Sequence, residues 1–302
     1  MSLNLNLCTS TLPNFSFTDA VEIALTSGYH GIELRVSDDY HKSLQELSTT
    51  GTFIKKQLLK AGLSVPVLNT YIPVEDDKSV DQLLECCQKM DIPSSRLVLP
   101  KSCGANIAKI ANVKEIIPSF EISDCEPVEL MKTLKKTLRV LERKAYKAGV
   151  KILLELHWGT VMSSFSSAYL LTYDLDPDCI AITFDPANMM VEGKEDWEFG
   201  LKLISSQIAN VHVKNVSWFS SNKGWSWEWA PIGVGMVNWP ELISLLLSNR
   251  YSGDYAIEDF LIPNHSKQAA IAYLVSVHNE FSKIYEHVSA TTLQPLICKR
   301  SR

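Results

Sequence analysis

The chain has 302 residues, of which 46% are hydrophobic and 21% are charged, and its formal net charge is -5. This composition supplies enough apolar side chains for one large core, so we expect a single domain. No long run of one charge sign occurs, which argues against an extended nucleic-acid surface because phosphate neutralisation needs clustered lysine and arginine.

The N-terminal segment, residues 1–15, contains neither a basic leader nor the apolar centre of a signal peptide. No run of about 18 consecutive apolar residues follows it anywhere in the sequence. The seven cysteines form an odd set without CxxC spacing, so neither a disulfide framework nor a thiolate zinc site is expected. We therefore expect a soluble, cytoplasmic protein.

Short apolar runs alternate with longer helical patterns along the chain, as they do where parallel strands are joined by crossover helices. Helices are expected to end at Gly28 and Gly149, and another to begin at Asn238 before Pro240. Eight such units favour an α/β fold, a single-domain (βα)8 TIM barrel. The expected strands cover residues 3–8, 31–35, 64–69, 95–99, 150–155, 179–184, 208–213 and 254–259.

An open, doubly wound sheet is the alternative for such an alternation. The segment LCTSTLPNF after the first strand contains no glycine, so the phosphate-binding turn of a dinucleotide fold is absent. We expect the barrel to occupy residues 1–288. Residues 289–302 have weak periodicity and are expected to form a C-terminal tail outside the core.

A polar side chain stands at the C-terminal end of each of the last four apolar runs, where barrels place their chemistry. These residues are Glu155, Asp185, His212 and Glu258. Any one of them alone could cap a helix or form an ion pair with a basic side chain. Converging carboxylates repel one another unless a cation or a proton lies between them. Together the four favour one divalent ion, such as Mn²⁺, Mg²⁺, Co²⁺ or Zn²⁺.

Five further polar residues are expected near the same end of the barrel. His157 and Lys214 each lie two residues beyond a proposed ligand, on the same side of a continuing strand. Asn188 follows the proposed aspartate ligand by three residues, while Glu33 and Asn69 end the GIEL and PVLN strands. We expect all five to contact the substrate. The alternatives are a structural hydrogen bond for His157, solvation at the surface for Lys214, and a satisfied barrel-lining polar group for Glu33 and Asn69.

Five of the seven tryptophans lie between residues 218 and 239. If the segment GWSWEW is extended, Trp225, Trp227 and Trp229 share one face. Such a face suits a lid over a sugar ring, a contact between subunits of a homo-oligomer, or buried packing.

The chain resembles the xylose-isomerase-like superfamily of barrels. The resemblance is carried by SGYHGIELR at residues 27–35, then by LLELHWGT, TFDPANM, NVHVKN, PIGVGMVNWPELISLL and YSGDYAIEDF, in this order. That family includes sugar isomerases, ketose 3-epimerases, hydroxypyruvate isomerases, inosose dehydratases and apurinic endonucleases. It implies that the four strand-end residues bind one metal ion, and that Glu155 and Glu258 act as acid and base.

The resemblance implies a metal-dependent isomerase or epimerase of a small sugar or polyol-derived ketone. The cation would chelate adjacent carbonyl and hydroxyl oxygens and stabilise an enediolate, while one glutamate removes a proton and the other returns it. A dehydratase of a related keto-polyol is the nearest alternative, because it uses the same enolate and expels a β-hydroxyl.

Two other classes are less favoured. An apurinic-site endonuclease would need a histidine-rich cluster of three zinc ions, but Asn188 stands where many family members have histidine, and WSWEWAP lacks the Asp-x-His pair. A non-catalytic barrel that binds a metal or a sugar is the other class. We expect a small-molecule substrate and neither a nucleic-acid nor a membrane partner.

Overall fold

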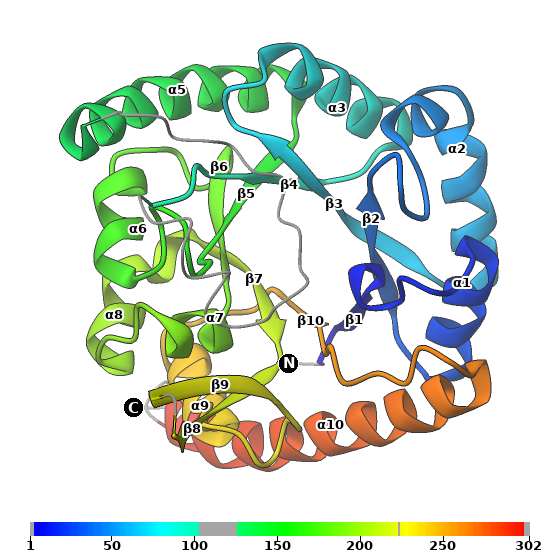
Figure 1. Cartoon of the computed structure of the whole chain (residues 1–302), viewed down its shortest axis with the longest axis vertical. Helices are drawn as coiled ribbons and strands as arrows, with labels where there is room; N and C mark the ends of the chain where they lie inside the picture. The colour runs from blue at the N-terminus through cyan, green and yellow to red at the C-terminus, as the bar shows by residue number, and fades with distance from the viewer. Residues whose placement is uncertain (1–2, 103–125, 223, 299–302) are drawn as a thin grey trace.

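The computed structural model of the chain describes residues 3–102, 126–222 and 224–298. Within these residues, eight parallel strands close into a barrel in the order β1-β10-β7-β6-β5-β4-β3-β2, and helices surround it (Figure 1). This confirms the expected (βα)8 architecture. The barrel strands are β1 (Leu5–Cys8), β2 (Gly31–Val36), β3 (Ser64–Pro73), β4 (Ser94–Val98), β5 (Lys151–Glu155), β6 (Ile180–Phe184), β7 (Ile208–Val213) and β10 (Asp254–Ile257).

The helices begin and end at the residues that local chemistry favours. Ser43 and Glu46 form a capping box at the start of α2, and Gly149 ends α5 in the left-handed conformation. Asn238 caps α9, as expected from the sequence. The helices are α1 (Phe17–Thr26), α2 (Leu44–Ala61), α3 (Asp77–Met90), α5 (Pro127–Ala148), α6 (Phe165–Thr172), α7 (Pro186–Val191), α8 (Trp197–Ile204), α9 (Trp239–Ser248) and α10 (Lys267–Cys298).

Each expected strand overlaps an observed one, and the largest difference is in β3. This strand continues to Pro73 instead of ending at residue 69. Its pairing with β4 shifts register between Asn69 and Pro73, which lets the strand continue past the shift and pair Pro73 with Val98. The extension carries Tyr71 to the mouth of the barrel.

Side chains along each strand point alternately outward and inward, and this alternation produces two separate apolar cores. Outward residues such as Leu154 pack between sheet and helices, whereas Val67, Leu153 and Ala181 form a small apolar cluster of their own. Because successive side chains of a strand point to opposite faces, Glu155 lies on the same face as Leu153 and one layer nearer the mouth. Along β5 the interior thus changes from apolar to polar toward the C-terminal end of the strand.

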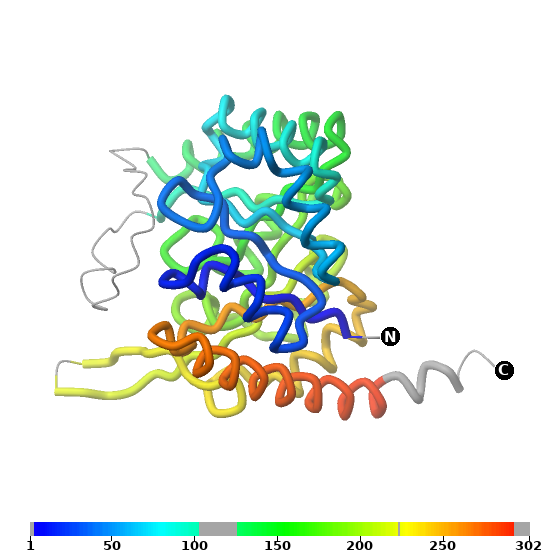
Figure 2. The backbone as a smooth tube through the Cα atoms, turned by 90° about the vertical axis from the view of Figure 1, so that its right-hand side faces the viewer, coloured from blue at the N-terminus to red at the C-terminus, as the bar shows by residue number. Residues whose placement is uncertain are grey.

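Two elements extend beyond the barrel. The antiparallel hairpin of β8 (Asn215–Ser221) and β9 (Gly224–Ala230) follows β7 and projects away from the end that holds the N-terminus (Figure 2). Helix α10 runs uninterrupted to Cys298, so residues 289–298 continue that helix. The domain boundary at residue 288 stays a prediction, and residues 299–302 lie outside the described part.

No helix in the described ranges is both long and apolar enough to cross a bilayer.

Candidate metal centre and active site

Four side chains from adjacent strands converge inside the mouth of the barrel. Glu155 ends β5, Asp185 follows β6 as the N-cap of α7, His212 lies in β7, and Glu258 follows β10. One ligand atom from each lies within 4.8 Å of those of the other three, and all four residues are buried. The structure therefore brings together the four residues that the sequence singled out, in an arrangement that could hold a metal ion.

His212 is oriented by carboxylates on both sides of its ring. Nδ1 lies 3.3 Å from Glu155 Oε1 and 3.3 Å from Glu258 Oε2. On the opposite side, Nε2 lies 3.1 Å from Glu33 Oε2, and Asn210 Nδ2 donates to Glu33 Oε1 at 2.7 Å. If a cation displaced the proton from Nδ1, the imidazole would still donate from Nε2 to Glu33 and would present the Nδ1 lone pair to the cluster.

The electrostatics of the cluster favour ionised carboxylates. Burial opposes their charge, but Arg96 and His212 hold the pKa of Glu155 well below its usual range. Lys214 and His212 likewise outweigh burial and lower the pKa of Glu258. In return, and again against burial, the carboxylates raise the pKa of His212 and of Lys214 well above their usual values. Such a concentration of buried negative charge is a suitable environment for a cation.

Lys214 lies between two of the proposed ligands. Its Nζ is 2.7 Å from Glu258 Oε2 and 2.9 Å from Asp185 Oδ2. Although Asp185 Oδ2 is buried and near this ammonium, it accepts no well-aligned hydrogen bond from the described residues. It is therefore a carboxylate oxygen with bonding capacity to spare, which fits a metal ligand.

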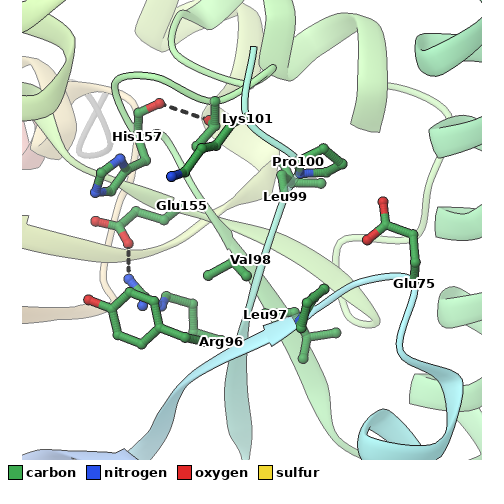
Figure 3. Close-up of a pocket in the computed structure, with 12 residues that line it drawn as sticks. Glu75, Arg96, Leu97, Val98, Leu99, Pro100, Lys101, Glu155 and His157 are labelled. Carbon is green, nitrogen blue, oxygen red and sulfur yellow. Dashed lines mark hydrogen bonds and ion pairs between the residues drawn. The ribbon is translucent and has the colours of Figure 1, made fainter. Parts of the chain in front are cut away.

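Asn188 and His157 also lie at the site. Asn188 Nδ2 donates to Glu155 Oε1 at 3.1 Å and to the carbonyl of Leu156 at 3.3 Å, which restrains the glutamate. His157 Nδ1 is 2.7 Å from the carbonyl of Trp158. Both residues line the main cavity, and Figure 3 shows the His157 ring beside Glu155. Their substrate contacts stay predictions that these positions permit.

Glu33 and Asn69 lie deeper than expected. Glu33 supports His212 from inside the barrel, and the Cys8 thiol donates to Glu33 Oε2 at 3.3 Å. Asn69 Oδ1 is buried and has no partner among the described residues. Neither residue is among those described as lining the cavity. Cys8, Glu33 and His212 could also surround an ion, but burial raises the pKa of the Cys8 thiol well above its usual value, which disfavours a thiolate ligand.

The mouth opens into a cavity of about 590 Å³. One wall consists of the proposed catalytic residues and their polar neighbours. Aromatic and basic side chains make up much of the remaining lining, together with smaller polar residues, which is typical of a small-molecule site. The aromatic and basic residues of this remaining lining are Arg35, Tyr40, Tyr71, Arg96, Trp158, Trp229 and Phe260.

Arg96 is a site residue that the sequence reasoning missed. It lies on the inner face of β4, where its Nη1 forms an ion pair with Glu155 Oε2, as Figure 3 shows. Its Nε and Nη2 donate to the carbonyl of Thr70 at 3.2 and 3.1 Å. The available signal was a charged residue in the middle of the short strand SSRLV, at an inward-facing position.

A family model described as xylose isomerase-like TIM barrel matches residues 21–275. The chain belongs to this family. It is 22% identical over 251 residues to a 3-dehydroshikimate dehydratase of Bacillus anthracis, an alignment that covers 79% of this chain and 85% of that protein.

Solved structures of similar proteins agree with this membership. The 3-keto-D-glucoside 4-epimerase of E. coli superposes with a TM-score of 0.66 at 16% identity, over 92% of this chain and 100% of that one. The IolI protein with a bound zinc atom superposes with a TM-score of 0.70 at 16% identity, over 95% of this chain and 99% of that one. At these identities the likeness shows the fold.

Proposed function

We propose that the protein is a metal-dependent isomerase or epimerase of a small sugar or a polyol-derived ketone. The observation that carries this proposal is the pair of buried, ionised glutamates at one cluster, because Glu155 Oε1 and Glu258 Oε2 each lie 3.3 Å from His212 Nδ1. Two such carboxylates can remove and return a proton on a substrate bound between them. The epimerase among the similar structures supports the same class of reaction.

The chain's own residues fit a divalent cation. Glu155, Asp185, His212 and Glu258 would hold it through three carboxylates and one imidazole, a donor set that suits Mn²⁺, Mg²⁺, Co²⁺ or Zn²⁺. The zinc atom in the similar IolI protein supports this assignment. When bound, the cation supplies Lewis-acid polarisation of a substrate carbonyl.

We assign proton removal to Glu258 and proton return to Glu155. Glu258 Oε1 accepts only a long hydrogen bond from Ser10 Oγ, at 3.3 Å, among the described contacts. Glu155 is held more firmly, since both of its oxygens have partners in Arg96, Asn188 and His212. Return of the proton to the neighbouring carbon gives isomerisation, whereas return to the opposite face of the same carbon gives epimerisation.

A dehydratase is the second candidate, supported by the relationship to a 3-dehydroshikimate dehydratase. It would begin with the same proton removal. The electron pair left on carbon would then expel a β-hydroxyl group, which needs a proton to leave as water. His157, at the cavity wall, is placed to donate that proton.

The proposal is tested by solvent exchange at the reacting carbon. Protein loaded with Mn²⁺ is incubated in heavy water with D-fructose, D-tagatose, L-ribulose and 3-dehydroshikimate, and deuterium uptake and products are followed by NMR. We expect metal-dependent uptake on at least one ketose, and we expect Glu258→Gln to reduce it by about 100-fold or more. The exposed Glu198→Gln on α8 is the matched control and should retain wild-type rates.

Exchange that survives in Glu258→Gln, or that needs no metal, would contradict the proposal. The protein would instead be assigned as a dehydratase if it removed water from 3-dehydroshikimate but neither exchanged protons on any ketose nor converted one.

A further inference from the structure

Arg35 is a cationic side chain at the cavity wall that the proposed proton transfer does not use. It lies in β2 two residues beyond Glu33, so it faces the barrel interior one layer nearer the mouth. Its guanidinium forms no ion pair with the described residues, and its buried Nε has no hydrogen-bond partner among them. Burial consequently lowers the pKa of Arg35, because water is removed without a contacting anion in return.

An aromatic ring holds this guanidinium in place. Arg35 Cζ lies 3.4 Å from the centroid of the Tyr71 ring and 5.2 Å from that of Tyr40. Cation–π contact fixes the plane of the guanidinium but provides no acceptor for its N–H groups. A held, planar donor without an acceptor is a preorganised site for an anion.

Arg96, on the same Tyr71 ring, differs from Arg35 in this respect. Its Cζ lies 4.5 Å from the ring centroid, but its charge is already matched by the ion pair with Glu155. Asp39 is the other acidic residue at this end of the cavity. It is exposed and accepts a hydrogen bond from Ser37, and it attracts Arg35 electrostatically without forming a contact ion pair with it in the described residues.

The carboxylates of the proposed metal centre have partners other than Arg35. Arg96 pairs with Glu155, Lys214 lies beside Asp185 and Glu258, and Asn210 donates a hydrogen bond to Glu33. None of these contacts involves Arg35, so its guanidinium is available to a group that arrives with the substrate.

We propose that Arg35 binds a carboxylate of the substrate, so that the enzyme acts on a sugar acid or another hydroxyketo acid. This inference rests on the proposed function for the other end of the substrate. One planar guanidinium matches one carboxylate in shape and charge. A phosphate usually takes a helix N-terminus or several bases, and only one unmatched base is described at this wall.

The cavity is continuous between the two ends of such a substrate, because Arg35, Glu155 and Glu258 all line it. Tyr71 and Arg96 lie between Arg35 and Glu155 along the wall. The carboxylate is therefore at the end of the substrate remote from the carbons that exchange protons.

Three ligands that differ only at C6 test the inference: D-fructose, D-fructuronate and D-fructose 6-phosphate. Their dissociation constants are measured by calorimetry on the folded, Mn²⁺-loaded protein. We expect D-fructuronate to bind about 10- to 100-fold more tightly than D-fructose, as for one charge-assisted pair. Arg35→Gln should reduce that ratio to near one, and Arg35→Lys should keep part of it. Arg143→Gln, an equal change at an exposed position of α5, should leave it unaltered.

Using the ratio of two affinities separates anion binding from a structural role of Arg35, since a displaced Tyr71 would weaken both ligands. A ratio near one in the wild type, a ratio that Arg35→Gln does not change, or no binding of the acid at all would overturn the inference. Tightest binding of D-fructose 6-phosphate through Arg35 would overturn the carboxylate assignment. An acid preference in a protein that catalyses no exchange on any acid would contradict the proposed function and leave this inference standing.

Discussion

Arg96 compensates the charge of Glu155 in the interior, where both side chains are almost fully buried. Replacing it by leucine leaves a buried carboxylate without its cation, and we expect Arg96→Leu to lower the free energy of unfolding by about 3 to 5 kcal/mol. Saturating Mn²⁺ should restore part of this loss, because the metal supplies positive charge to the same carboxylate. Urea unfolding with EDTA and with Mn²⁺ measures both effects.

The matched control for Arg96 is Arg139→Leu on α5. Arg139 pairs with Glu142 and Asp174 at the surface, so its removal should cost less than about 1 kcal/mol and should not respond to Mn²⁺. Equal losses in the two variants, or a loss in Arg96→Leu that Mn²⁺ does not reduce, would show that Arg96 does not compensate Glu155.

At the level of single residues, the sequence predicted which four side chains cluster at the barrel mouth better than it predicted their surroundings. Glu155, Asp185 and His212 could be found because each interrupts or ends an apolar strand, a signal contained in a few neighbouring positions. The hydrogen bond between His212 and Glu33 could not be predicted in this way, since it depends on β2 and β7 approaching each other across the barrel. No local pattern specifies which inward-facing side chains meet in the centre.

The hairpin of β8 and β9 supplies a wall of the cavity. The ring centroids of Trp229 and Phe260 are 5.1 Å apart, and Lys214 Nζ lies 5.1 Å from the centroid of the Trp229 ring. Trp227 contacts both Trp229 and Trp158, at 5.0 and 5.6 Å. This places Trp229 in the cavity wall and Trp227 against two tryptophans of that wall, consistent with the lid among the roles expected from the sequence.

Trp229 and Trp225 offer a comparison within one strand. We expect Trp229→Ala to lower kcat/KM about tenfold, because it removes the cation–π contact that helps position Lys214. Trp225 is 70% exposed, and Trp225→Ala should change kcat/KM less than about twofold. Initial rates on the best substrate of the exchange panel measure both. Equal losses would mean that the hairpin acts as a whole and that Trp229 has no particular role.

Among the elements, the extension of β3 shows what strand patterns alone do not predict. The apolar run PVLN ends at Asn69, so the expected strand ended there, yet pairing with β2 and β4 continues the strand to Pro73. Backbone hydrogen bonds to neighbouring strands can override a local change of polarity. The position of Tyr71 at the barrel mouth, and therefore its contact with Arg35, depends on that tertiary pairing.

At the scale of the whole molecule, the alternation of strands and helices was sufficient to predict a closed barrel. Closure requires β1 to pair with β10, and the register Leu7 to Ile257 shows this parallel contact between the two ends of the sequence. The hairpin inserted after β7 was not predicted as a sheet of its own, because the alternation of tryptophans in GWSWEW does not specify the strand with which that segment pairs.

The proposed metal centre connects four strands that are consecutive around the barrel, since the order β10-β7-β6-β5 contains all of its ligands. A cation that binds only when these strands are in place must stabilise the whole fold by mass action. Mn²⁺ at about 100 times its dissociation constant should raise the free energy of unfolding by about 2.7 kcal/mol, and EDTA should abolish the gain.

His212→Ala should remove this increment, whereas the exposed His265→Ala should keep it. Chemical denaturation at constant pH measures the increment in each variant. If none of Mn²⁺, Mg²⁺, Co²⁺ and Zn²⁺ produces it, or if His212→Ala retains it, the four side chains do not form a metal centre and their negative charge is balanced by Arg96, Lys214 and protons alone.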